Sequence, residues 1–80
     1  YEKTGKILKS LDANQKAKEI NPQDAEVHNN LGNVLEKLEK FDEAQNNYRQ
    51  AILLEKNYTE AYYNLANLLN KLSRFDEAEI

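Results

Sequence analysis

The feature that most constrains this chain is an internal repeat with a period of 34 residues. When residues 25–46 are aligned with residues 59–80, 11 of the 22 pairs are identical. The identities include Leu31 with Leu65, and a Phe-Asp-Glu-Ala tetrapeptide that ends at Ala44 and again at Ala78. A fixed period of this length is typical of a solenoid, in which one unit stacks on the next because neither buries its apolar face alone. The sequence therefore predicts a repeat architecture.

Composition indicates which secondary structure builds the repeat. The chain has 80 residues, of which two are glycine and one is proline. Because the two strongest helix breakers are nearly absent, helix is favoured throughout. A chain of this length forms at most one small domain. We expect an all-α fold without strands.

Charge, hydropathy and cysteine content exclude several classes of partner and site. The chain has 11 Lys and Arg against 14 Asp and Glu, so no basic excess is present and a nucleic-acid partner is not expected. There is no apolar run of membrane-spanning length and no charged-then-apolar leader, which predicts no membrane insertion and a soluble chain, with the cytoplasm as the default compartment. Without cysteine, disulfides and thiolate metal sites are excluded.

Apolar periodicity and capping residues place the first helices. We expect one helix over about residues 6–20, with the polar Asn14 interrupting its apolar stripe. Asn21 as N-cap and Pro22 as first helical residue predict a second helix over residues 22–39, because proline at that position loses no hydrogen bond. Phe41 opens the next helix, followed by two acids where the helix dipole favours negative charge.

The repeat places the remaining helices. A further helix follows Asn57, and Phe75 restarts the second helix of that unit. Turns are therefore expected near Gly5, Asn21, Lys40, Asn57 and Arg74. The apolar stripes predict that the most buried residues are Leu31, Leu35, Leu38, Ala44, Tyr48, Ala51, Leu65 and Leu69.

The residues of the repeat carry a family resemblance. The pattern His28-x2-Leu31-Gly32-x2-Leu35 with Ala44-x3-Tyr48, and its second copy Tyr62-x2-Leu65-Ala66-x2-Leu69 with Ala78, resembles the tetratricopeptide repeat, of the superhelical asparagine-ladder type. The resemblance implies a right-handed solenoid of antiparallel helix pairs. On its register, residues 1–24 end one repeat, residues 25–58 form a full repeat and residues 59–80 begin another. Ala66 stands where the family has glycine.

The sequence offers no catalytic constellation. His28 is the only histidine, and no cysteine or hydroxyl partner lies at a spacing that would build a triad or a metal cluster. Its repeat equivalent is Tyr62, which shares its planar shape but not its acid–base chemistry near neutral pH, so a packing role is expected for His28. We expect no enzyme activity, no cofactor and no metal.

A polar pattern in the repeat points to binding. We call the polar row the residues Glu26, Asn30, Asn33 and Lys37, which share one helix face, together with their identical repeat equivalents Glu60, Asn64, Asn67 and Lys71. Core packing does not require identical polar residues. The family resemblance implies that this face lines a concave surface that binds peptide. The alternative is that these amides bridge neighbouring helices, since amides at a buried edge usually find a protein partner.

The leading hypothesis is a protein–protein interaction module that binds an extended peptide through asparagine side chains. The candidate binding residues are Asn29, Asn30, Asn33, Lys37, Tyr63, Asn64, Asn67, Asn70 and Lys71. One alternative is a substrate-presenting accessory region of a larger enzyme such as a glycosyltransferase. Another is a self-assembly scaffold, for which end-to-end association of the chain with its copies is expected.

Overall fold

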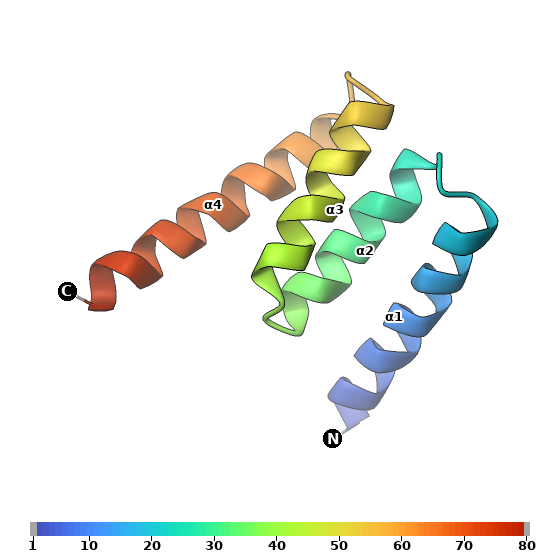
Figure 1. Cartoon of the computed structure of the whole chain (residues 1–80). Coiled ribbons are helices and arrows are strands. Elements are labelled where there is room, and N and C mark those ends of the chain that lie inside the picture. The colour runs from blue at the N-terminus through green and yellow to red at the C-terminus, as the bar shows by residue number, and fades with distance from the viewer. Residues whose placement is uncertain (1, 80) are drawn as a thin grey trace.

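The structure is a computed structural model that describes the backbone of residues 2–79 and the side chains of residues 5–73. It contains four helices: α1 (Glu2–Ile20), α2 (Ala25–Lys37), α3 (Phe41–Leu54) and α4 (Thr59–Glu79). Figure 1 shows α1, α2 and α3 side by side, with α2 and α3 antiparallel. Over residues 2–79 there is no strand, so the predicted all-α repeat fold is confirmed.

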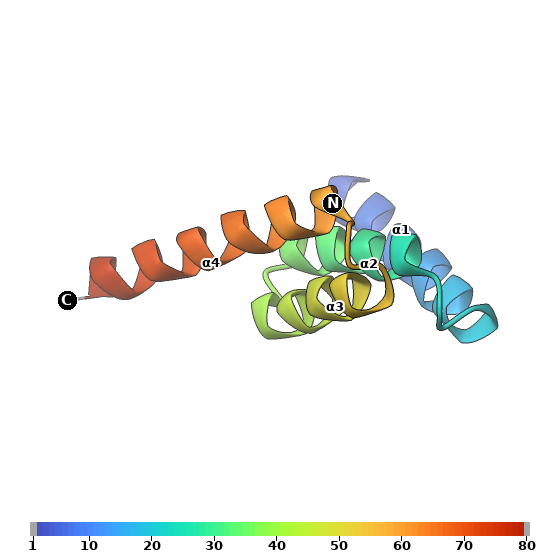
Figure 2. The same cartoon turned by 90° about the horizontal axis from the view of Figure 1, so that it is seen from above.

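α4 differs from the other helices in how it is placed. Its N-terminal half lies against the α2–α3 pair, whereas its C-terminal half projects away from the other three helices (Figures 1 and 2). Figure 2 also shows α3 in a separate layer from α2 and the beginning of α4. The first helices of the two units, α2 and α4, therefore share one layer, with the second helix of the full unit behind them.

The start of α2 corrects the sequence prediction. Asp24 is the N-cap, and its Oδ1 accepts a hydrogen bond from the Glu26 backbone N–H at 3.0 Å. The expected cap, Asn21, instead closes the last turn of α1, because its N–H donates to the Ala17 carbonyl at 2.9 Å. Pro22 lies in the turn between the helices. A carboxylate at the N-cap accepts a hydrogen bond from a free N–H of the first turn and also interacts favourably with the helix dipole. Both effects favour Asp24 as the N-cap.

The turn between α2 and α3 reverses the chain within three residues. The Lys40 N–H donates to the Leu35 carbonyl and the Glu39 N–H to the Glu36 carbonyl, both at 2.9 Å, which is the pattern of a Schellman motif. Glu39 has a φ of 62°, in the left-handed region that usually favours glycine. This backbone geometry is unfavourable for glutamate by about 1–2 kcal/mol, so the packing of α3 on α2 must stabilise it.

The core lies between α2, α3 and α4. Its largest cluster of buried side chains is Leu31, Leu35, Ala44, Tyr48 and Leu68, and a second cluster consists of Ala25, Ala51 and Ala61. The predicted burial of Leu31, Leu35, Ala44, Tyr48 and Ala51 is confirmed.

Three core predictions are wrong. Leu38 and Leu65 are half-buried, and Leu69 is 41% exposed. The sequence predicts burial of Leu65 and Leu69 because they repeat Leu31 and Leu35 in the apolar stripe, where the two helices of a unit are expected to meet. In α4 the fully buried residues are Ala61 and Leu68, and Leu65 packs against the core only in part, since α4 contacts only the α2–α3 side of the molecule.

Gly32 of α2 lies directly against the Tyr48 ring of α3. A Cβ atom placed on Gly32 would lie 2.4 Å from Cε1 and 2.6 Å from Cδ1 of Tyr48. Real Cβ atoms essentially never come this close to another heavy atom. Glycine at this position therefore leaves room for the fully buried Tyr48 ring against α2.

Two predicted turns are absent. α1 runs without a break through Gly5, and α4 runs through Arg74, so Phe75 does not begin a separate helix. The turn at Glu39 is stabilised by a whole helix that packs back on α2. No helix packs back on α4 in that way among residues 2–79, so the intrahelical hydrogen bonds of α4 continue. α4 therefore continues where its sequence equivalent, α2, ends.

Candidate functional site

Polar side chains of α2 and α4 line a groove between these helices, with a volume of about 260 Å³. The residues that line the groove are Asn33, Glu36 and Lys37 from α2, and Asn64, Asn67 and Lys71 from α4. All but Glu36 belong to the polar row identified in the sequence. The structure thus brings equivalent positions of the two units to one surface.

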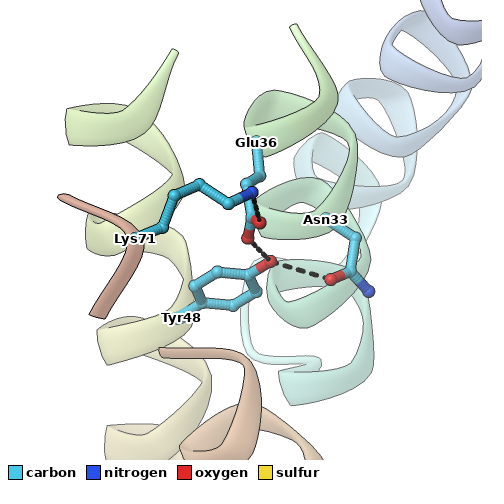
Figure 3. A network of polar contacts seen from close by, with 4 residues as sticks. All are labelled: Asn33, Glu36, Tyr48 and Lys71. Atoms are coloured by element: carbon cyan, nitrogen blue, oxygen red, sulfur yellow. Dashed lines mark hydrogen bonds and ion pairs between the residues drawn. The ribbon is translucent and has the colours of Figure 1, made fainter. Parts of the chain in front are cut away.

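A buried hydroxyl holds two of the groove residues in place (Figure 3). Tyr48 from α3 is fully buried, and its hydroxyl reaches through to α2. It donates to Asn33 Oδ1 at 2.7 Å and to Glu36 Oε1 at 3.0 Å. One proton is therefore shared between two acceptors. The Asn33 oxygen points inward, and its amide nitrogen is directed away from Tyr48 (Figure 3).

The environment of Tyr48 keeps this hydroxyl protonated. Burial raises the pKa of the Tyr48 phenol most, and the Glu36 carboxylate raises it further through its hydrogen bond and its negative charge. Ionisation would place a phenolate against a carboxylate in a site with little water. Tyr48 therefore remains a hydrogen-bond donor well beyond neutral pH.

Glu36 links the buried network to α4. Its Oε2 lies 2.8 Å from Lys71 Nζ, which also lies 5.9 Å from the centroid of the Phe41 ring. The pair is partly exposed, with 46% of the Lys71 side chain and 21% of the Glu36 side chain accessible, so its contribution to stability is small. Lys37, by contrast, makes no ion pair with any side chain of residues 5–73. The positive charge of Lys71 is thus offset inside the groove, and that of Lys37 is not.

A second bridge joins α2 to α4. Asn64 Nδ2 donates to Asn29 Oδ1 at 3.0 Å, and Asn29 Nδ2 makes a long contact of 3.5 Å with the Tyr58 hydroxyl. Asn29 is only 2% exposed, which corrects its predicted place on the groove wall. Its amide joins the two repeat units. Burial raises the pKa of Tyr58, whereas the contact with Asn29 opposes the rise.

Three other predicted residues lie outside the groove lining. Asn30, Tyr63 and Asn70 are exposed, and Tyr63 is 67% accessible. Their side chains make no hydrogen bond or ion pair within residues 5–73, and their role in binding stays a prediction. The alternative for the polar row was that its side chains bridge neighbouring helices. It applies to Asn64 and Lys71, each of which contacts a side chain of α2.

His28 has the environment of a packing residue. It is 3% exposed, with Nε2 2.9 Å from the Pro22 carbonyl and Nδ1 3.2 Å from Asn47 Oδ1. The Asn47 amide is oriented by its own hydrogen bond to the Glu43 carbonyl at 3.0 Å. Among the described residues, no group of three or more histidine or acidic side chains could hold a metal ion.

Glu36 is the groove residue that sequence reasoning missed. The sequence assigns Glu36 to a solvated helix face, because it lies among alternating acidic and basic residues, and its repeat equivalent is the different residue Asn70. A different signal was available. Both bridges, Asn29–Asn64 and Glu36–Lys71, join residues 35 positions apart, which is one more than the period. A search for complementary side chains at that offset would have found Glu36.

Comparisons with known proteins agree with this geometry. A family model described as "Tetratricopeptide repeat" matches residues 25–58, and another with the same description matches residues 47–80. Together they cover residues 25–80, more than half of the chain. No curated protein matches the chain.

Over residues 2–79, no helix combines the length and apolar character needed to cross a lipid bilayer.

Proposed function

Because the chain belongs to the tetratricopeptide repeat family, whose repeats generally mediate protein–protein interactions, we propose that its groove binds an extended peptide segment of a partner protein. The observation that carries the proposal is the fixed carboxamide of Asn33. A buried residue of the next helix orients it, and it lies beside Asn67 at the surface of the groove. Asn67 makes no hydrogen bond with another side chain within residues 5–73.

Carboxamides suit the main chain of a peptide. An asparagine side chain offers one acceptor and two donors, so it can pair with the C=O and N–H of a peptide unit whatever side chain that unit carries. In this groove Asn33 uses its oxygen internally, so it offers N–H groups to peptide carbonyls. Asn67 can offer both donor and acceptor. Binding of this kind depends on an extended backbone and tolerates many sequences.

The charges of the groove add a preference. Glu36 and Lys71 offset one another, whereas Lys37 is exposed and has no ion-pair partner among the described side chains. A peptide with an acidic side chain near Lys37 is therefore favoured over one with a basic side chain. Because the site is open to solvent, this charge contributes to selectivity more than to affinity.

The test uses the protein as it exists and replaces residues whose side chains make no hydrogen bond or ion pair within residues 5–73. Asn33 and Asn64 both make hydrogen bonds within the protein, so their loss would alter packing as well as binding. The double variant Asn67→Ala/Lys37→Ala avoids this problem. Asn46→Ala, at an exposed position of α3, is the matched control. Partners recovered with each variant would be quantified by mass spectrometry.

Loss of the Asn67 amide contact is worth roughly 0.5–1.5 kcal/mol and loss of the exposed Lys37 charge up to about 1 kcal/mol, so the double variant should weaken partner binding by about tenfold. The Asn46→Ala control should retain every partner. If the double variant recovers all partners as well as the wild-type protein does, the groove is not the binding site.

A further inference from the structure

The side of the groove that α2 lines offers a ligand hydrogen-bond donors. Three residues of α2 line it: Asn33, Glu36 and Lys37. The Asn33 oxygen and one Glu36 oxygen already accept from the Tyr48 hydroxyl. The other Glu36 oxygen accepts from Lys71. The polar groups left for a ligand are therefore the amide nitrogen of Asn33 and the ammonium group of Lys37, both of which only donate.

The orientation of the Asn33 carboxamide decides this polarity. Its oxygen lies 2.7 Å from the Tyr48 hydroxyl, a separation typical of O–H···O bonds and at the short limit of N–H···O bonds. Figure 3 shows the amide nitrogen directed away from Tyr48. Burial and the Glu36 carboxylate raise the pKa of Tyr48, so the hydroxyl keeps the proton that it donates. Tyr48 thus leaves the amide nitrogen of Asn33, and not its oxygen, for a ligand.

The side of the groove that α4 lines is different. Asn64 donates its amide nitrogen to Asn29 Oδ1 at 3.0 Å, so among residues 5–73 its own oxygen is left to accept. Asn67 is exposed and lines the groove, and its carboxamide can both donate and accept. A ligand therefore meets donors along α2, and both donors and acceptors along α4.

This difference matters to a peptide main chain. In an extended peptide, the N–H and the C=O of one residue point to the same side. A residue that faces Asn33 can pair its C=O with the Asn33 amide, but its N–H then meets a donor and stays unpaired. An unpaired donor is unfavourable once the contact removes its water, and only in part here because the groove is open to solvent. Proline has no N–H, so it keeps the favourable contact without the unfavourable one.

We propose that the peptide bound in the groove carries proline at the residue that faces Asn33, and ordinary residues where it faces α4. The inference rests on the proposed function, because it takes the groove to be a peptide site. It adds the chemical class of the partner segment, which is an extended segment with a proline and, for Lys37, an acidic neighbour. Tyr48 acts through Asn33 without touching the peptide, so it is the positioning residue for this preference.

The probes are three acetylated and amidated peptides of the sequence Ala-Ala-Ala-Glu-Ala-Ala, with alanine, proline or N-methylalanine as the third residue. N-methylalanine lacks the N–H but has no ring, so it separates the missing donor from the shape of proline. Binding to the isotope-labelled protein would be followed by NMR titration, through the side-chain amide signals of Asn33 and Asn67. The proline and N-methylalanine peptides should each bind about threefold more tightly than the alanine peptide, which alone leaves an N–H unpaired.

Two variants change the group that position 33 presents. Asn33→Asp keeps an oxygen for Tyr48 but turns a second oxygen to the groove, so the alanine peptide should now bind about threefold more tightly than the other two. Tyr48→Phe releases the Asn33 carboxamide, so the preference should vanish. Asn46→Ala, at an exposed position of α3, is the matched control and should keep the wild-type order.

The comparison is made within each variant. All three peptides carry the same charge, so a change in the charge of the protein affects them equally, and the stiffness of proline is the same against every variant. Helical circular dichroism shows whether each variant folds. If Tyr48→Phe does not fold, Asn33→Asp decides the question alone.

Several outcomes would overturn the inference. Equal binding of the three peptides, with shifted Asn33 and Asn67 signals, would do so and would leave the proposed function standing. Tighter binding of the alanine peptide to the wild-type protein would mean that the Asn33 oxygen faces the groove. A preference for proline that N-methylalanine does not share, or that survives Asn33→Asp, would have its cause in the ring. If no peptide shifts the Asn33 or Asn67 signals, the proposed function fails together with the inference.

Discussion

The substitution Gly32→Ala offers the sharpest test of how α2 and α3 pack. In an ordinary helix, replacement of glycine by alanine stabilises by about 1 kcal/mol. Here the new Cβ would lie 2.4–2.9 Å from three atoms of the Tyr48 ring. The ring cannot swing away, because it is fully buried and its hydroxyl bonds to both Asn33 and Glu36.

The expected magnitude follows from two opposing terms. Insertion of a methyl group into a packed core is destabilising by up to about 3 kcal/mol, and the three close approaches favour the upper end of that range. Subtracting the gain in helix propensity of about 1 kcal/mol leaves a net destabilisation of about 2 kcal/mol. The measurement is urea denaturation followed by helical circular dichroism.

Two other positions provide matched controls for Gly32→Ala. Gly5→Ala on α1 has no atom within 4 Å of the new Cβ, so it should stabilise the chain by about 1 kcal/mol. Ala66→Gly on the exposed part of α4 should destabilise it by a similar amount. If Gly32→Ala stabilised the chain as Gly5→Ala does, the close contact between Gly32 and Tyr48 would be refuted.

Three further predictions concern the interior of the molecule. Tyr48→Phe should lower the free energy of unfolding by about 1–3 kcal/mol, because Asn33 and Glu36 lose their donor, and urea denaturation would measure it. Since the folded-state pKa of Tyr48 is raised, the stability that its neutral form contributes is present below about pH 10 and is lost as pH rises above that value. Melting curves across that range should therefore show a steeper loss for wild type than for Tyr48→Phe, and equal slopes would contradict this. Leu68→Ala should lower the free energy of unfolding by about 2–5 kcal/mol, whereas Leu69→Ala, at an exposed site, should change it by less than about 1 kcal/mol. Equal losses would contradict the observed burial.

The repeat made the architecture and most of the groove predictable. Identical residues at a 34-residue spacing indicate equivalent positions on successive units, so Asn33 and Asn67, or Lys37 and Lys71, could be placed together without coordinates. The core of the complete unit was predictable for the same reason. Its apolar stripe in α2 faces the stripe of α3, and both helices are present in full.

The wrong predictions concern residues that occupy equivalent positions in the two units but have different neighbours in the structure. Leu69 matches the buried Leu35, but burial depends on a covering helix that α4 does not have in this structure. The same cause explains why Glu39 adopts a left-handed turn while its equivalent, Ser73, stays helical. Asn29 was misplaced for another reason. A polar residue on the edge of a helix faces either solvent or the next helix, and local sequence does not distinguish the two.

The two bridges between α2 and α4 have a mechanical consequence. They attach the helices at residues 29 and 36 on one side and 64 and 71 on the other, which are separated by about 10 Å along each axis. A single attachment would act as a pivot, whereas two attachments at this separation resist rotation of one unit against the next. One is a part-buried amide pair, and the other is a partly exposed ion pair that salt screens. In a longer stack of such units, the amide pair therefore holds neighbouring units together at one end of each helix pair at any ionic strength. At the other end the attachment depends on the ion pair, so the curvature of the stack there changes with ionic strength.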